Sequence, residues 1–365
     1  MTRQQIWQKM TAHLDLPLLA GMALLMVASL LTLYSASDHS FERVMAQSAN
    51  ILVGLCCLWV VANLPLHYLM RTAVPIYVLG IVLLIGVALF GEISHGARRW
   101  LNIGVATIQP SELMKVGVPL MMAWYFEKYE TSLSLKNYVV AALLLLLPVG
   151  LIARQPDLGT ALLISASGFY VLFLAGLSWR VMGGLFVAAV ASAPLMWSML
   201  HDYQRHRIEM LFDPTQDALG KGYHTIQGMI AVGSGGILGK GYLNGTQTHL
   251  DFLPERTTDF IFAVYSEEFG LVGNLILLAI YFFVISRGFV ITANASTYFT
   301  RLMAGSITLT FATYAFVNMG MVSGILPIVG VPLPLISYGG TSMLTLLLGF
   351  GMLMSIQTHK KLVKS

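Results

Sequence analysis

The segment from Phe252 to Gly270 carries the residues best suited to catalysis in this sequence. It reads FLPERTTDFIFAVYSEEFG and brings Glu255, Arg256 and Asp259 to the entrance of a long apolar run. At such a border, burial raises the pKa of a carboxylate and a neighbouring arginine lowers it. This kind of adjustment suits a general base. We therefore predict that Asp259 is the catalytic base. An acid that only caps the start of a helix is the alternative.

Two further groups of charges lie at the edges of apolar runs. Glu112 and Lys115 are three residues apart and would share one face of a helix, while Asp157 begins another run. A charge at the centre of a membrane helix costs about 2.5–3.5 kcal/mol, so we expect these side chains to cluster at one membrane face, with Glu112 and Lys115 paired inward. A structural staple and a charged helix start remain the alternatives. Glu267 and Glu268 lie deeper, and we expect them to be interhelical partners.

Arginines gather in the connections that share a side with these acids. They are Arg43, Arg98, Arg99, Arg205, Arg207 and Arg256. A guanidinium group binds a phosphate through two charge-assisted hydrogen bonds, so their concentration predicts an anionic partner such as phosphate or pyrophosphate. Anchoring of the chain at the depth of the lipid headgroups is the alternative.

The string GSGGILGKG, Gly233 to Gly241, invites comparison with a nucleotide-binding P-loop. The spacing does not fit, because Ser234 and Gly241 stand where that motif needs Gly and Ser or Thr. We expect instead a flexible loop whose glycines permit a close backbone approach or a positive φ.

The elements that position these residues are predicted to lie in a membrane. Of the 365 residues, 56% are hydrophobic and only 10% are charged, whereas a soluble domain carries about 25% charged residues. Apolar runs of the roughly 20 residues that cross a hydrocarbon core recur along the chain. We place them at residues 17–34, 48–64, 72–91, 112–126, 138–153, 158–176, 181–200, 259–286, 302–322 and 336–357. The predicted fold is an all-α polytopic membrane protein with about ten transmembrane helices.

We expect one membrane domain over residues 1–365, since no internal repeat or low-complexity segment divides the chain. Its longest connection, residues 201–258, joins the seventh and eighth runs and is rich in Gly, His and charge. A connection of this length is rarely idle in a compact domain. We therefore expect the working face on its side of the membrane.

Basic residues are distributed unequally between the two sides. An even number of spans puts both termini on one side, which carries Arg3, Lys9, Arg71, Lys128, Lys136, Arg180, Arg287, Arg301, Lys360, Lys361 and Lys364, with Asp15, Glu127 and Glu130 as its acids. The positive-inside rule makes this side cytoplasmic and the 201–258 connection extracytoplasmic. The net charge of +4 is thus explained by topology, and nucleic acid is not an expected partner.

Five motifs, in this order along the chain, resemble those of the SEDS family of shape, elongation, division and sporulation proteins. They are ARRW, QPSE, QPDLGT, LPERTTDFIFA and PLPLISYGG. The resemblance covers nearly the whole chain. The series HDYQRHR, GYHTIQ and GSGG makes it most similar to the elongation members. One departure is Thr257, which stands where many relatives carry His.

The resemblance implies a peptidoglycan glycosyltransferase that polymerises lipid II into β-1,4 glycan strands by an inverting mechanism, on the outer face of the bacterial cytoplasmic (inner) membrane. It identifies Asp259 as the catalytic aspartate. The residues expected to bind the substrate, from the resemblance and from the arginine cluster together, are Arg43, Arg99, Glu112, Lys115, Asp157, Arg205 and Arg256. No tight cluster of metal ligands is visible, so a divalent cation, Mg or Mn, would bridge a carboxylate and the pyrophosphate. No organic cofactor is expected.

The expected partners are lipid II, a class B penicillin-binding protein transpeptidase and other membrane proteins of the elongation machinery. Two other functions remain open. A flippase for a lipid-linked precursor would also need buried charges and broken helices, although such charges would be spread through the midplane or repeated in two halves. A non-enzymatic scaffold of the elongation machinery is the second alternative.

Overall fold

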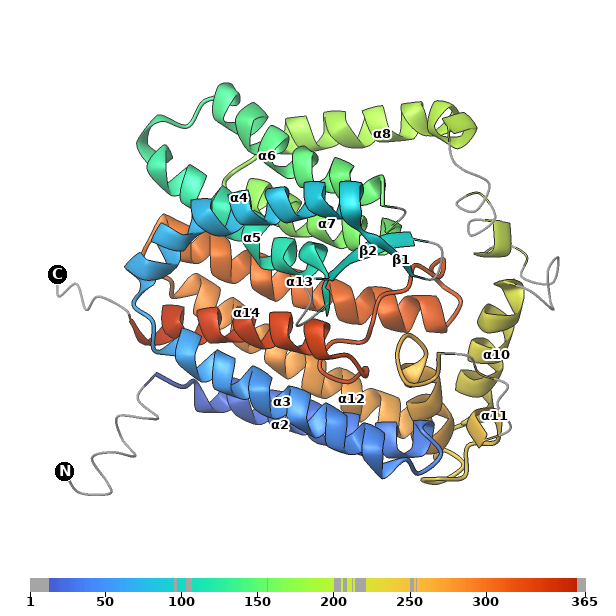
Figure 1. Ribbon diagram of the computed structural model, residues 1–365. Helices are drawn as coiled ribbons and strands as arrows, with labels where there is room; N and C mark the ends of the chain where they lie inside the picture. The colour runs from blue at the N-terminus through green and yellow to red at the C-terminus, as the bar shows by residue number, and fades with distance from the viewer. Residues whose placement is uncertain are drawn as a thin grey trace, which may run out of the picture.

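The computed structural model describes residues 13–94, 97–102, 107–155, 157–199, 205, 209–211, 213, 221–249, 253 and 255–359. Each of the predicted apolar runs lies largely within a helix, so the all-α polytopic fold is confirmed (Figure 1). These helices are α2 (Leu16–Ala36), α3 (Phe41–Ala62), α4 (Leu66–Phe90), α5 (Pro110–Lys128), α6 (Leu135–Ala153), α7 (Leu158–Leu174), α8 (Trp179–Met199), α12 (Ile261–Ala293), α13 (Tyr298–Val322) and α14 (Gly340–Thr358).

Seven of the described helices are long and apolar enough to cross a membrane, namely α2, α3, α4, α6, α12, α13 and α14. Helix α7 and the first part of α8 are shorter apolar helices. The protein is therefore embedded in a membrane. The number of ten membrane spans stays a prediction.

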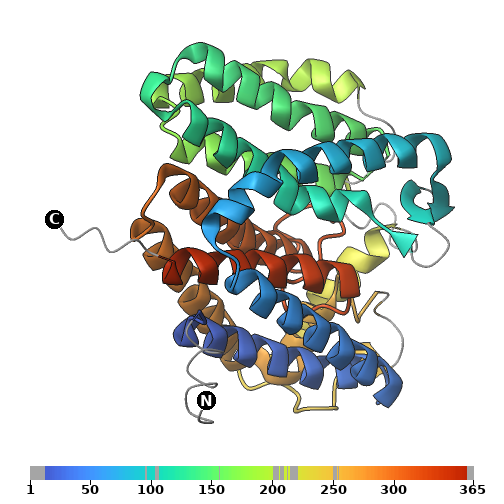
Figure 2. The same ribbon diagram turned by 60° about the vertical axis from the view of Figure 1, so that its left-hand side comes forward.

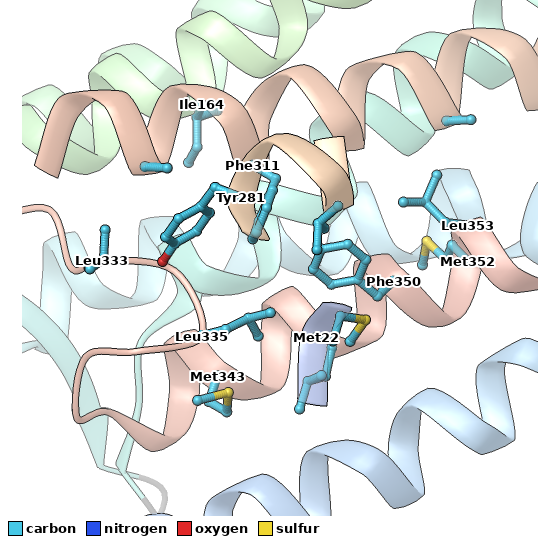
Figure 3. Close-up of a cluster of buried hydrophobic side chains, with 14 of the residues drawn as sticks. Met22, Ile164, Tyr281, Phe311, Leu333, Leu335, Met343, Phe350, Met352 and Leu353 are labelled. Atoms are coloured by element: carbon cyan, nitrogen blue, oxygen red, sulfur yellow. The ribbon is translucent and has the colours of Figure 1, made fainter. Parts of the chain in front are cut away.

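Helix α13 forms the centre of the bundle and packs against α5, α7, α12 and α14 (Figures 1 and 2). Most of it is buried, and Phe311 contacts the rings of Tyr281 on α12 and Phe350 on α14 at 5.6 and 5.0 Å between centroids (Figure 3). Tyr281 also donates a hydrogen bond of 2.6 Å to the carbonyl of Pro334. The core thus fixes the long connection between α13 and α14.

A small antiparallel sheet lies between α4 and α5, where no strand was predicted. Its strands, in the order β1-β2-β3, are β1 (Glu92–Ser94), β2 (Ala97–Asn102) and β3 (Thr107–Ile108). Strand β2 carries Arg98 and Arg99 and packs against the end of α4 and the start of α5. The sheet thereby directs this basic segment toward the start of α5.

The predicted long connection is partly helical. Its described residues include the helices α10 (Lys221–Ser234) and α11 (Thr246–His249). Helix α10 packs against α12 and α13. A short 3₁₀ turn, η1 (Glu130–Ser132), joins α5 to α6 at the opposite end of the bundle. In the HDYQRHR segment, residues 201–204, 206 and 207 lie outside the described residues.

Both described chain ends lie at the end of the bundle opposite α10 and α11 (Figure 1). The rings of His13 and His359 stack there with centroids 4.5 Å apart. At this same end, Arg287 of α12 forms hydrogen bonds of 2.7–3.2 Å with Asp15. This arrangement agrees with an even number of crossings.

Candidate active site

Asp259 lines a cavity of about 260 Å³ at the end of the bundle that carries α10. The walls come from α10, the start of α12, residues 210–211 and the α13–α14 connection. The lining residues are Met210, Leu211, His224, Thr225, Glu255, Asp259, Phe260, Leu326, Pro327 and Ile328. Apolar walls with a few convergent polar groups are typical of a ligand site.

The backbone around Asp259 is held by the core rather than by a helix cap. Phe260 occupies the N-cap position of α12, and no side chain caps this helix. Asn318 of α13 donates hydrogen bonds to the carbonyls of Asp259 (2.8 Å) and Val331 (2.7 Å), and Ser337 donates to the carbonyl of Thr258 (2.7 Å). The structure therefore does not support the alternative in which Asp259 serves as a helix cap.

The α13–α14 connection comes close to both Asp259 and the start of α7. Gly330 has a φ of +71°, and a Cβ there would lie 3.4 Å from Oδ2 of Asp259. A Cβ on Gly159 would lie only 2.4 Å from the carbonyl oxygen of Val329. Because α7 and this connection are in such close contact, Asp157 at the start of α7 belongs to the surroundings of Asp259.

Asp157 is buried, and its two carboxylate oxygens have different partners. Its Oδ1 accepts a hydrogen bond from the amide of Thr160 (3.3 Å) and so caps α7. Its Oδ2 lies 3.8 Å from Nε of Arg99 and 3.5 Å from Nε2 of Gln109. The carboxylate thus also holds the arginine of β2 beside the start of α5.

Glu112 and Lys115 form the predicted pair on α5. Nζ of Lys115 lies 2.5 Å from Oε1 of Glu112, while Oε2 accepts a hydrogen bond of 3.0 Å from Thr345 of α14. Nζ also lies 5.2 Å from the centre of the Tyr314 ring. A mainly apolar cavity of about 50 Å³ between α5, α13 and α14 adjoins the lysine. The pair therefore links three helices, and Lys115 lines the cavity between them.

Helix α13 connects this pair to Asp259. Tyr314, beside Lys115, and Asn318, which binds the carbonyl of Asp259, are four residues apart on α13. Four residues correspond to about one turn and 6 Å of rise, so the two side chains share a face. The structure thus brings Lys115, Glu112, Asp157 and Asp259 to one region of the bundle.

The arginines predicted to bind the substrate differ in their surroundings. Arg205 donates to the carbonyls of Trp197 (3.0 Å) and Ser198 (2.7 Å) at the end of α8, which is a structural contact. Arg256 pairs with Asp38 at the end of α2. Arg43 lies exposed in the first turn of α3. Nothing is described of Arg207 or of the side chain of Arg98.

His224 belongs to the cavity but was not predicted as a site residue. Its ring stacks on Phe260, with centroids 6.1 Å apart. Burial lowers the pKa of His224 below its ordinary 6.5, and the nearby Glu255 opposes this shift only in part. The imidazole is therefore neutral at pH 7. The histidine in GYHTIQ was visible in the sequence, but only the folding of α10 onto α12 places it here.

The glycine-rich string is not arranged as a phosphate-binding loop, because two of its backbone amides donate hydrogen bonds to α12. The amides of Lys240 and Gly241 donate to the carbonyls of Glu267 and Glu268, each at 3.0 Å. Gly236, Gly239 and Gly241 have positive φ values, as expected. The string is a docked element rather than the flexible loop that was predicted.

The cavity offers a limited set of metal ligands. No group of three or more His, Cys, Asp or Glu side chains suited to a metal occurs among the residues that the structure describes. Glu255 and Asp259 both line the cavity, however, and carboxylate oxygens suit Mg²⁺. This pair fits a cation that takes its other ligands from a phosphate group and water.

Together, the bundle and its cavity define a polytopic helical membrane protein with a carboxylate site at one end. Residues 9–362 match the family of cell cycle proteins that comprises FtsW, RodA and SpoVE, and the chain belongs to this family. It is 50% identical to the peptidoglycan glycosyltransferase MrdB of Escherichia coli K12, over 99% of this chain and 97% of that protein. The Helicobacter pylori 26695 protein of the same name is 36% identical, over 96% and 90%.

Solved structures agree with this assignment. A chain from a peptidoglycan synthase complex that coordinates polymerization and crosslinking superposes with a TM-score of 0.83 at 30% identity, over 95% of this chain and 99% of that chain. The rod shape determining protein RodA of Thermus thermophilus superposes with a TM-score of 0.72 at 29% identity, over 94% and 96%. The likeness therefore covers the whole bundle.

Proposed function

We propose that the protein is a peptidoglycan glycosyltransferase that polymerises lipid II into β-1,4 glycan strands by an inverting mechanism. The observation that carries this proposal is Asp259 in the wall of a cavity at one end of a membrane bundle, with its backbone fixed by Asn318. The names of its relatives, peptidoglycan glycosyltransferases at up to 50% identity, support the reaction class.

Asp259 acts as the base in this mechanism. The carboxylate accepts the proton of the 4-hydroxyl of the acceptor sugar as that oxygen attacks the anomeric carbon of the donor. The bond from this carbon to the pyrophosphate breaks on the opposite face, and the configuration inverts from α to β. A single base is sufficient, because no covalent intermediate with the enzyme is formed.

Cationic side chains receive the departing pyrophosphate. Lys115 and Arg99 are best placed, because both lie beside carboxylates in the region that α13 and α7 share with Asp259. Arg43 is exposed and accessible to a lipid-borne anion. Arg205 contributes only if the substrate displaces it from the carbonyls of Trp197 and Ser198. Arg256 contributes only if the substrate displaces it from Asp38. A divalent cation held by Glu255 would neutralise charge on the leaving group, while the Asp259 carboxylate stays free to accept the proton.

Partners and localisation follow from the same proposal. Lipid II would reach the site from the outer leaflet of the bacterial inner membrane, with both termini in the cytoplasm. A class B penicillin-binding protein, which would crosslink the strands, and other proteins of the elongation machinery are the proposed partners. The likeness to a chain of a synthase complex supports the first of these.

The substitution Asp259→Asn in purified protein tests the proposal. It preserves the size of the side chain and removes the base, so glycan synthesis from lipid II should fall at least 100-fold, within the 10²–10⁴-fold range of general base catalysis. Undiminished polymerisation would exclude Asp259 as the base. Thermal unfolding in detergent should be unchanged, which separates lost chemistry from lost fold.

Reconstituted vesicles distinguish the two alternatives. A flippase would move labelled lipid-linked precursor between leaflets without lengthening it, and Asp259→Asn would affect transport. A scaffold would bind the transpeptidase and leave lipid II unchanged. The collection of the described site charges at one end of the bundle, rather than along a path through it, favours chemistry over transport.

A further inference from the structure

The glycine-rich string fills a break in α12. Gly270 has a φ of +64° and interrupts the helix, which otherwise runs from Ile261 to Ala293. The carbonyls of Gly236 and Ile237 accept hydrogen bonds from the amides of Leu271 (2.9 Å) and Val272 (3.0 Å), just after the break. Backbone groups that a broken membrane helix leaves unpaired must find partners within the protein. The string supplies these partners from outside the helix.

The fit between the string and the break leaves no room for a side chain at the closest contacts. A Cβ on Gly239 would lie 2.0 Å from the carbonyl oxygen of Glu268, and one on Gly235 would lie 2.1 Å from that of Ser266. Gly270 would clash equally, because its Cβ would lie 2.3 Å from the amide nitrogen of Gly239. The two backbones are therefore in direct contact.

A buried carboxylate fastens this contact. Glu267 is fully buried, and its Oε1 accepts hydrogen bonds from Nζ of Lys240 (2.7 Å), the hydroxyl of Thr246 (3.1 Å) and the amide of Gln247 (3.1 Å). One side chain of α12 thus binds three residues of the 201–258 connection. None of these atoms lines the cavity of Asp259.

The fastened elements run to that cavity. Helix α10 ends at Ser234, inside the string, and its other end carries His224 and Thr225 into the cavity wall. The first part of α12 begins beside Asp259, and a Cβ on Gly228 of α10 would lie 2.9 Å from the ring of Phe260. The two helices lie side by side from the cavity to the break.

From this geometry we propose that Lys240 and Glu267 are positioning residues for the glycosyl transfer. Their ion pair locks the string into the break of α12 and thereby sets the distance between α10 and the turn that carries Asp259. This inference rests on the proposed polymerase function. Without the lock, α10 separates from the first part of α12, the cavity widens, and Asp259 is displaced from the acceptor hydroxyl.

The test uses Glu267→Gln and Lys240→Met in the full-length protein, with Lys240→Arg as the conservative variant. Asp15→Asn is the matched control, because it breaks a similarly buried and hydrogen-bonded ion pair, with Arg287, at the other end of the bundle. All variants are followed by polymerisation of lipid II at several concentrations and by amide hydrogen exchange.

We expect kcat to fall about 10–100-fold in Glu267→Gln and Lys240→Met, since a displacement of about 1 Å can cost that much, while KM changes little. Hydrogen exchange should accelerate in residues 221–241 and 261–272 and nowhere else. Lys240→Arg should retain kcat within about threefold. Asp15→Asn should lose thermal stability yet keep kcat.

The outcomes separate the two proposals. If wild-type protein polymerises lipid II and Glu267→Gln retains its kcat, or loses activity without faster exchange in residues 221–241, the positioning role is excluded. An equal fall of kcat in Asp15→Asn would also exclude it, since general destabilisation would then suffice. If wild-type protein makes no polymer, the polymerase proposal fails, and the positioning role fails with it.

Discussion

At the scale of single residues, Glu112 and Lys115 form a structural pair, and the proposed mechanism also gives Lys115 a chemical role. Substituting one member of a buried pair leaves the other charge unpaired, at a cost of about 3–5 kcal/mol, so Lys115→Met alone should lose both stability and activity. The double variant Glu112→Gln, Lys115→Met removes both charges. We expect it to regain most of the melting temperature lost by Lys115→Met and to remain at least tenfold less active than wild type.

The measurements are thermal unfolding in detergent and glycan synthesis from lipid II. Recovery of both stability and activity in the double variant would assign the pair to structure alone. Failure to recover stability would show that Glu112 is also needed for its hydrogen bond with Thr345.

His224 should govern part of the pH dependence. Since burial lowers its pKa below 6.5, it is neutral at pH 7 and gains a proton only as the pH falls below that value. The imidazolium would then attract the carboxylates of Glu255 and Asp259 and weaken the base. We expect activity to fall on the acid side, and His224→Gln to shift the midpoint of this fall to lower pH.

Rate against pH, from pH 5 to 8, checks this expectation. His67→Gln, an exposed histidine at the start of α4, should leave the midpoint unchanged. An identical profile for His224→Gln and wild type would show that another group causes the acid limb.

Candidate site residues could be picked from the sequence where the burial of a charge is costly. Asp157, Glu112 and Lys115 could be singled out because few charges occur beside apolar runs, and the structure places them near one another. His224 could not be found in this way. Its importance depends on which residues α10 contacts, which the local sequence does not specify.

At the scale of elements, hydropathy predicted the long helices because the length of an apolar run is a local property. The sheet between α4 and α5 and the docking of the glycine string were missed, since both consist of pairings between separate segments. The break in α12 was missed for the same reason. Gly270 alone does not indicate a break until a partner is found for the amides that follow it.

Gly270→Ala should therefore destabilise the protein strongly. Alanine at a φ of +64° is strained, and its Cβ would lie 2.3 Å from the backbone nitrogen of Gly239, which has no flexible side chain to move away. Gly150→Ala on α6 is the matched control, because nothing lies within 4 Å of its Cβ position. Alanine there should be neutral or stabilising by up to about 1 kcal/mol.

Thermal unfolding of the two variants in detergent measures this difference in stability. A melting temperature for Gly270→Ala equal to that of wild type would mean that α12 straightens without loss. The docked string would then be a consequence of the bend and not its partner.

At the scale of the molecule, the connections that were predicted to be cytoplasmic from their charge lie together at one end of the bundle. Contacts join them there. Arg287 pairs with Asp15 there, Glu127 accepts a hydrogen bond of 2.5 Å from the amide of Phe299, and Ser355 donates to the carbonyl of Leu64. The cavity of Asp259 lies at the other end, with α10. From the positive-inside rule we predict that the end with the cavity faces outward.

Cysteine accessibility tests this orientation. In a background where Cys56 and Cys57 are replaced by Ala, Thr131→Cys and Asn244→Cys place a thiol on exposed residues at opposite ends of the bundle. A membrane-impermeant maleimide added to intact spheroplasts should label Cys at position 244 and should reach position 131 only after the membrane is permeabilised. The reverse pattern would put Asp259 in the cytoplasm, where a lipid-linked substrate displayed on the outer leaflet cannot meet it, and the proposed polymerase function would be untenable.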